Sequence, residues 1–114
     1  MPSDPRQFLH DVVSATGLIG AFVQGRSYQD YATDPLLRSA CERQLEIVGE
    51  AMTRLRDHHP NVFESVSEAR EIIGLRNRLI HGYDAVDDAI VWDVISRKLV
   101  ELDRLVKLLL NNPE

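Results

Sequence analysis

The chain has 114 residues, of which 44% are apolar and 27% charged, and its formal net charge is −5. This composition is typical of a globular protein with one hydrophobic core, so we expect a single domain over residues 1–114 and a cytoplasmic location. The acidic balance counts against a protein that coats nucleic acid by bulk electrostatics, and no apolar run reaches the ~18 residues of a membrane span.

The sequence predicts four helices, and each of the first two begins with its own Asp-Pro pair, Asp4-Pro5 and Asp34-Pro35. The first helix is predicted over residues 5–24 and the second over residues 35–58. In each, the aspartate is a natural N-cap and the proline that follows fits the first helical position, where its missing N–H costs nothing. Residues 26–33 are expected to form a connection with room for one helical turn.

The third helix is expected to begin near Ser65, where Ser65-x-x-Glu68 fits a capping box, and to end at His81 or Gly82. On a helical wheel its isoleucines and leucines share one broad apolar face, and Arg76 falls near the middle of that face. Arginine is almost never fully buried without a partner. Arg76 is therefore expected to contact other protein groups rather than open water.

Geometry alone leaves two interpretations of Arg76. It either forms a salt bridge at the edge of the core, with Glu46 or Glu50 of the second helix, or it lines a cleft within the bundle or between two subunits. His81 lies about 140° from Arg76 around an ideal helix. The two side chains can therefore meet on one substrate only if the helix ends or bends near His81, or if a dimer brings two copies together.

The fourth helix is predicted over residues 87–110, with Asp87 at its start and Val86 and Val91 at the two positions of a hydrophobic staple. The connections between the predicted long helices are short, which favours antiparallel neighbours. The predicted fold class is therefore all-α, an up-down antiparallel bundle of four helices.

A polar motif ends the third helix: residues 76–83 read RNRLIHGY, which has the form R-x4-H-x-Y. The segments CERQLEIVGEAMTRL (41–55) and EIIGLRNRLIHGYDAVDDAIVWDVI (71–95) extend the pattern on both sides. In this order, over roughly residues 4–110, they resemble the HepT-like toxins of the HEPN superfamily. One departure is that Val62 and Phe63 stand where many relatives carry a tryptophan.

This resemblance implies one HEPN-like helical domain that forms a homodimer, with both R-x4-H segments near the interface cleft. It implies a metal-independent endoribonuclease that needs no cofactor and acts on RNA as the toxin of a type II toxin–antitoxin system. It also implies a partner, an antitoxin of the minimal nucleotidyltransferase type often called MntA. Such antitoxins are similar to enzymes that transfer AMP onto the tyrosine of the motif, which is Tyr83 here.

The residues of the motif suit metal-free RNA cleavage. The imidazole of His81 can transfer protons near neutral pH, and the guanidinium of Arg76 can stabilise negative charge on the phosphate. Asn77 would orient His81 or the substrate across one helical turn, and Arg78 would add a phosphate contact. Tyr83 would stack on a base or hydrogen-bond the phosphate, and AMP attached to Tyr83 would block the site by bulk and negative charge.

Structural explanations compete with each of these roles. A histidine near a helix C-terminus often only satisfies terminal carbonyls, Arg78 fits a solvated surface, and Tyr83 on an apolar face fits the core. For the whole protein, the alternatives are a non-catalytic HEPN module that binds nucleotides or docks to a nucleotidyltransferase, and a purely structural helical dimer. Cys41 is the single cysteine, so it permits no internal disulfide and suggests no thiolate metal site.

Overall fold

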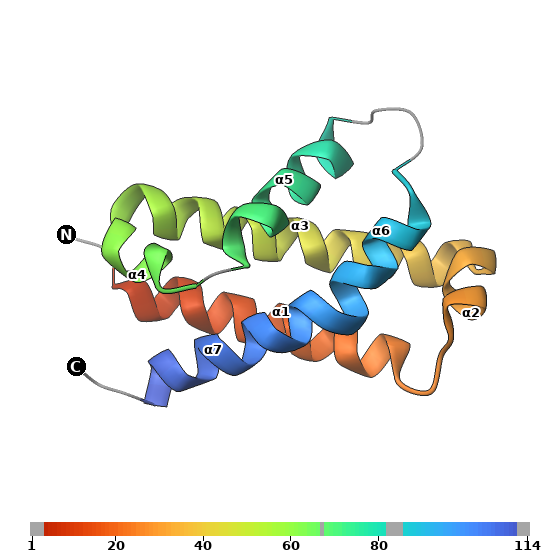
Figure 1. Ribbon diagram of the computed structural model, residues 1–114, viewed down its shortest axis with the longest axis horizontal. Coiled ribbons are helices and arrows are strands. Elements are labelled where there is room, and N and C mark those ends of the chain that lie inside the picture. The colour runs from red at the N-terminus through yellow and green to blue at the C-terminus, as the bar shows by residue number, and fades with distance from the viewer. Residues whose placement is uncertain (1–3, 67, 82–85, 112–114) are drawn as a thin grey trace.

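The computed structural model describes residues 4–66, 68–81 and 86–111, and this part of the chain is helical throughout, with no strand (Figure 1). The elements are α1 (Pro5–Val23), α2 (Tyr28–Thr33), α3 (Pro35–His58), α4 (Pro60–Glu64), α5 (Ala69–Ile80), α6 (Asp88–Asp93), the π-helical turn η1 (Val94–Lys98) and α7 (Leu99–Asn111). The predicted all-α class is confirmed for these residues. More helices form than the four expected, so a regular up-down bundle of four helices stays a prediction.

The two Asp-Pro starts are confirmed. The carboxylate of Asp4 accepts a hydrogen bond from the amide of Arg6, 2.9 Å away. Asp34 accepts from the amides of Leu36 and Leu37, at 3.0 and 3.2 Å. Both carboxylates satisfy amides that lack a partner in the first helical turn. The connection between these helices holds the short helix α2, which has its own capping box between Ser27 and Asp30.

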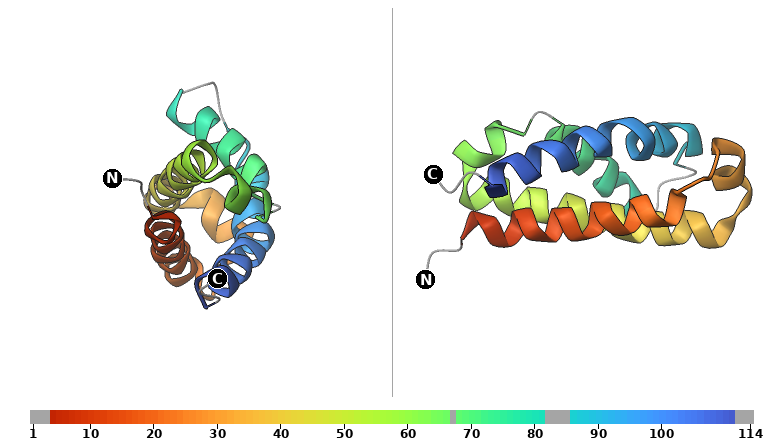
Figure 2. Two further views of the ribbon diagram at one scale, coloured as in Figure 1. Left: turned by 90° about the vertical axis from the view of Figure 1, so that its left-hand side faces the viewer. Right: turned by 90° about the horizontal axis from the view of Figure 1, so that it is seen from below.

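The core lies between four helices. Helix α3 packs along α1 and α5, and α7 packs along α1 (Figures 1 and 2). Apolar residues at helical spacing supply most of the buried side chains, which in α1 and α3 include Phe8, Val12, Ala15, Ile19, Leu37, Cys41, Leu45, Val48, Met52 and Leu55. Among the described residues, no helix combines the length and the hydropathy needed to cross a bilayer.

The predicted start of the third helix is wrong. After Pro60 the chain forms α4, and Ser65 ends that helix in an α-helical backbone conformation (φ −83°, ψ 0°) instead of the extended conformation of an N-cap. The Ser65 hydroxyl donates to the carbonyl of Val62 at 2.6 Å. Helix α5 begins only after Glu68, whose side chain makes no capping bond. The physical reason is that Ser65 caps α4, whose Phe63 is buried in the core, so it is not available as the N-cap of α5.

The start of the fourth predicted helix is confirmed, because the carboxylate of Asp87 accepts from the amide of Ala89 at 2.8 Å. The chain then continues through α6, η1 and α7 as one rod with a wider turn in its middle (Figure 1). At this turn Lys98 forms an ion pair with Glu71 of α5. The rod is thereby tied to the helix that carries the R-x4-H residues.

Candidate active site

Helix α5 places Arg76 against α3. The side chain of Arg76 is 23% exposed, and its Nη2 donates to Oε1 of Glu50 at 2.6 Å. Its Nη1 donates to Oδ1 of Asn77 at 3.0 Å, while its buried Nε has no hydrogen-bond partner within the described part of the chain. The other oxygen of Glu50 accepts from Nε of Arg54 at 2.9 Å. Of the two partners predicted for Arg76, Glu46 and Glu50, the structure therefore selects Glu50.

Gly49 allows this close contact between the two helices. A Cβ atom on Gly49 would lie 2.3 Å from Cβ and 2.6 Å from Cγ of Arg76, well inside van der Waals contact. The stem of Arg76 therefore occupies the space that a side chain at position 49 would fill. Sequence analysis missed this role of Gly49. The available signal was an isolated glycine in the middle of an apolar-striped helix, which usually has a packing reason.

Arg76 also lines a groove of about 320 Å³ on the outer side of α3. The described residues that line it come from three helices: Asp11 from α1; Arg43, Glu46, Ile47, Glu50, Ala51 and Arg54 from α3; and Arg76 and Ile80 from α5. Ile80, expected on the apolar face of the third helix, is 43% exposed here. Arg76 thus forms the predicted salt bridge and also lines a groove of one protomer, whereas a cleft between two subunits stays a prediction.

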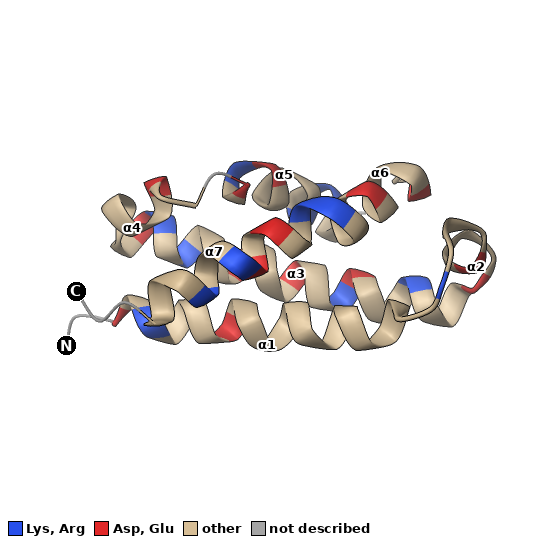
Figure 3. Ribbon diagram, turned by 60° about the horizontal axis from the view of Figure 1, so that its bottom comes forward, with Lys and Arg blue, Asp and Glu red and all other residues tan. Residues whose placement is uncertain are grey.

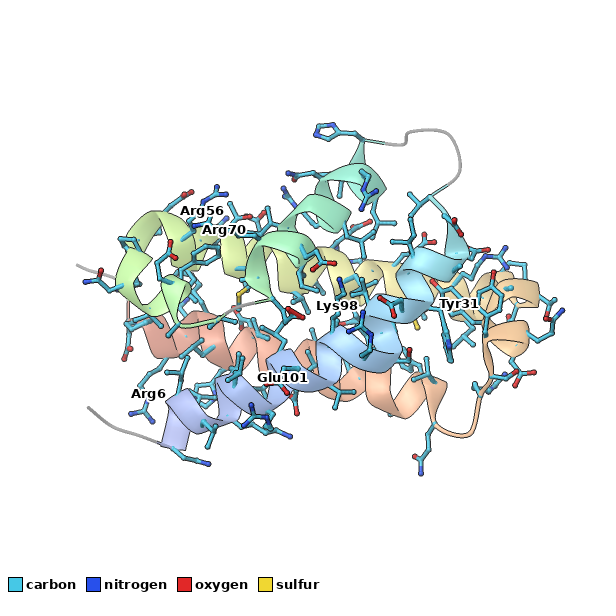
Figure 4. The ribbon with its side chains drawn as sticks, in the orientation of Figure 1. Arg6, Tyr31, Arg56, Arg70, Lys98 and Glu101 are labelled. Atoms are coloured by element: carbon cyan, nitrogen blue, oxygen red, sulfur yellow. The ribbon has the colours of Figure 1, made fainter. Side chains whose placement is uncertain are left out.

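Fixed charges nearly cancel in this groove, since three arginines face three carboxylates. In the view of Figure 3, basic and acidic residues are interspersed along the helices and α1 is largely uncharged. Arg70, close to Arg76 in the sequence, is held elsewhere. It pairs with Glu64 at 2.7 Å and its guanidinium lies 5.3 Å from the ring centre of Phe63, on the α4 side (Figure 4).

Helix α5 ends where the motif predicted an end. Its last residue is Ile80, and the amide of His81 donates to the carbonyl of Asn77 at 3.2 Å as the C-cap. The side chain of His81 is exposed and is not among the described residues that line the groove of Arg76. The structure therefore does not bring Arg76 and His81 together in one groove of one protomer.

The remaining predicted site residues lie around this helix end. Asn77 and Arg78 are both exposed, and Asn77 contacts Arg76 through its side-chain oxygen. Gly82 and Tyr83 lie outside the described residues. The roles assigned to Asn77, Arg78 and Tyr83 therefore stay predictions.

A second polar cluster lies away from this groove, where α2, α3 and α6 meet. Tyr31 is fully buried with its ring centre 5.5 Å from that of Trp92, and its hydroxyl has no hydrogen-bond partner in the part of the chain described (Figure 4). Burial raises the pKa of the neighbouring Glu42 carboxyl, and the negative charge of Asp88 adds to the effect. Tyr31, Glu42 and Asp88 thus belong to α2, α3 and α6, and none of them is among the described residues that line the groove of Arg76.

Two further observations concern metal-binding side chains and the single thiol. Residues 4–66, 68–81 and 86–111 hold no group of three or more His, Cys, Asp and Glu side chains that could bind a metal ion. Cys41 is buried, and burial raises the pKa of its thiol to about 11. A buried thiol with a raised pKa is a poor nucleophile and ligand.

Comparisons with known proteins cover nearly the whole chain. The sequence model of the family described as "Ribonuclease HepT-like" matches residues 13–109. A candidate RNase of Caldanaerobacter subterraneus subsp. tengcongensis is 36% identical over 110 residues, which cover 93% of this chain and 94% of the relative. A candidate RNase of Methanocaldococcus jannaschii is 28% identical over 105 residues (92% of this chain, 95% of the relative). A candidate ribonuclease HepT of Thermococcus cleftensis is 30% identical over 105 residues (90% of this chain, 92% of the relative). No solved structure matches the chain.

Proposed function

The chain belongs to the HepT-like ribonuclease family of the HEPN superfamily, and we propose that it is a metal-independent endoribonuclease, the toxin of a type II toxin–antitoxin system. The observation that carries the proposal is the arrangement of α5. Arg76 is held at a groove by contacts with α3, and the helix ends at His81, five residues further on. A fixed guanidinium can stabilise charge on a phosphate and an exposed imidazole can transfer protons, and metal-free cleavage of RNA needs both of these functions.

In this reaction a base removes the proton of a ribose 2′-hydroxyl, and the 2′-oxygen attacks the adjacent phosphorus. The P–O5′ bond breaks, the 5′-oxygen takes up a proton, and a 2′,3′-cyclic phosphate remains. We assign the proton transfers to His81, because imidazole is the side-chain group that most often serves as a general base or acid in enzymes. Arg76 stabilises the charge on the pentacoordinate phosphorane. Glu50 and Asn77 occupy two of its five N–H donors, so donors remain on its terminal nitrogens for phosphate oxygens.

The proposed active unit is a homodimer of one HEPN-like domain per chain. Within one protomer Arg76 lines the groove, whereas His81 lies exposed at the end of α5. Two α5 ends that face each other would bring the partner's His81 toward the groove of Arg76. Arg78 at the same helix end would add a phosphate contact, and Asn77 would keep the guanidinium of Arg76 in its orientation.

The proposed control of the toxin is chemical. An MntA-type antitoxin would transfer AMP from ATP to the hydroxyl of Tyr83, with release of pyrophosphate. The added phosphate would bring bulk and negative charge to the place where the RNA phosphate binds, so the modified protein would be inactive. Toxin and antitoxin would meet in the cytoplasm, where the RNA is.

The test is incubation of the purified protein with total RNA in excess EDTA. We expect cleavage, with fragments that end in a 2′,3′-cyclic phosphate. Cleavage that appears only after Mg²⁺ is added would contradict metal independence. An inactive sample whose intact mass includes AMP on Tyr83 would agree with a silenced toxin. An inactive and unmodified chain that binds ATP or GTP in calorimetry would favour a non-catalytic nucleotide-binding module.

A further inference from the structure

The carboxylates of the groove beside Arg76 differ in how many of their oxygens have a hydrogen-bond partner. Both oxygens of Glu50 are engaged, Oε1 by Arg76 and Oε2 by Arg54. Glu46 lies one turn earlier on α3, and its side chain is only 28% exposed. Its Oε1 receives a single long contact of 3.4 Å from Arg43, whose own side chain is 68% exposed. In the part of the chain described, Oε2 of Glu46 has no partner, so this carboxylate has spare acceptor capacity.

An apolar wall adjoins this carboxylate. Ile47 and Ala51 of α3 and Ile80 of α5 line the same groove, and Ile80 is 43% exposed. A flat, uncharged group with N–H donors at its edge fits both features, because its face covers the apolar side chains and its edge meets Glu46. The guanidinium of Arg43, whose side chain is 68% exposed, can stack on the opposite face of such a group.

The near-zero net charge of the groove also favours binding of an uncharged portion of the RNA. The three arginines and three carboxylates of the groove cancel, so it gains little from holding a further phosphate. A nucleobase is neutral and flat, and the groove already contains the arginine that we assign to the scissile phosphate.

We propose that this groove binds the base next to the cleaved bond and that Glu46 selects guanine. The inference rests on the proposed ribonuclease function. Guanine presents two neighbouring donors, N1–H and the N2 amino group, which match the two oxygens of one carboxylate. Adenine, cytosine and uracil place an acceptor beside their donor on the same edge, and that acceptor would repel Glu46. A bidentate pair of this kind discriminates between bases by about tenfold or more.

The main test is the base preference at the cleavage site. A random-sequence RNA pool is cleaved by the wild type, by Glu46→Gln and by Glu101→Gln, and the fragment ends are sequenced. Glu101 is a matched control because it forms the same i,i+3 pair with an arginine, Arg104, but lies on α7, which does not line the groove (Figure 4). Asp11→Asn serves as a second comparison, since Asp11 faces the groove from α1.

We expect the wild type and Glu101→Gln to cleave with at least about tenfold enrichment of guanine at one position beside the cut. Glu46→Gln should lose this enrichment, because its amide has one acceptor oxygen and a donating NH2 group in place of the second carboxylate oxygen, so it cannot pair with both N–H donors of guanine. A wild type without base preference, a preference for another base, or a guanine preference that survives Glu46→Gln would overturn the proposal. Loss of the preference in Asp11→Asn alone would overturn the role of Glu46.

Binding of the uncleavable deoxydinucleotides d(GpA), d(ApG) and d(ApA), measured by calorimetry, separates this proposal from the nuclease itself. If the wild type cleaves no RNA but binds one guanine dinucleotide about tenfold tighter than d(ApA), and Glu46→Gln does not, the base site stands without the nuclease. If RNA is cleaved without base preference, the nuclease stands and the base site fails. With neither cleavage nor guanine-dependent binding, both proposals fail.

Discussion

Arg76 and Glu50 join helix α5 to α3 through an ion pair in which Nη2 of Arg76 lies 2.6 Å from Oε1 of Glu50. The side chains are 23% and 40% exposed, so this pair is intermediate between a surface ion pair and a fully buried one. The same contact that stabilises the helix packing also fixes the direction of the guanidinium proposed to bind phosphate.

Replacement of this arginine is predicted to reduce activity far more than stability. We expect Arg76→Ala to lower RNA cleavage by about 10²–10³-fold, as does the loss of other preorganised donors to a transition state. The free energy of unfolding should fall by about 1–2 kcal/mol, because the pair is only partly buried. Urea denaturation and RNA cleavage measure the two effects.

Arg54→Ala is the control for that variant, because Arg54 shares Glu50 but its own side chain is 58% exposed. We expect it to change stability little and cleavage by less than about tenfold, as is usual for exposed ion pairs. An Arg76→Ala protein that cleaves RNA as fast as the wild type would show that this residue is only structural.

A methyl group at position 49 is predicted to push α5 away from α3. Gly49→Ala would place a Cβ atom 2.3 Å from Cβ of Arg76, so the helices must separate. We expect a loss of about 1–3 kcal/mol in the free energy of unfolding, as overpacked cores show, together with weaker RNA cleavage because the guanidinium moves. Thermal or urea unfolding of the purified variant measures the first effect.

Gly74→Ala supplies the matched comparison, since a Cβ there meets nothing within 4 Å. It should stabilise α5 by about 0.5–1 kcal/mol, the usual gain from replacing glycine by alanine inside a helix. Equal stability changes in the two variants would mean that Gly49 is not the point of close contact.

The carboxyl of Glu42 gives the fold a pH dependence away from the proposed site. Its pKa is raised by burial and by the charge of Asp88, while Arg38 opposes the shift. Because the folded-state pKa is higher than the unfolded one, ionisation of Glu42 destabilises the fold above the folded pKa. Below the unfolded pKa, about 4.3 for glutamate, the effect is absent.

Glu42→Gln should therefore melt at a higher temperature than the wild type at pH 7, and the difference should shrink as the pH falls toward about 4. Melting curves of both proteins at pH 7, 5.5 and 4 test this. A variant that melts below the wild type at pH 7 would show that the Glu42 carboxylate stabilises the fold instead.

The elements that the sequence predicts well depend on local signals. The starts of α1 and α3 follow from an aspartate cap and a proline at the next position, and each buried face follows from helical spacing. The start of α5 could not be predicted in this way. Phe63 is buried in the core and α4 forms before α5, and this packing is not visible in the local sequence signals at Ser65.

The candidate site could be proposed from the sequence as a set of residues, but its arrangement could not. The motif identified Arg76 and His81, and the wheel placed Arg76 on the packed face of its helix. The choice of Glu50 over Glu46 could not be made, because the two lie one turn apart on the same face of α3. The closeness at Gly49 and the position of His81 outside the groove depend on how α5 lies on α3.

The central claim is that His81 transfers protons in metal-free RNA cleavage, and one paired measurement tests it most directly. Wild type and His81→Ala, purified identically and matched in melting temperature, are incubated with total RNA in excess EDTA. His81 is an exposed helix-end residue, so its removal should leave the fold intact. We predict cleavage by the wild type and a rate at least about 10²-fold lower for the variant, the usual contribution of a general acid–base group. Equal cleavage by the two proteins would contradict the assignment of His81.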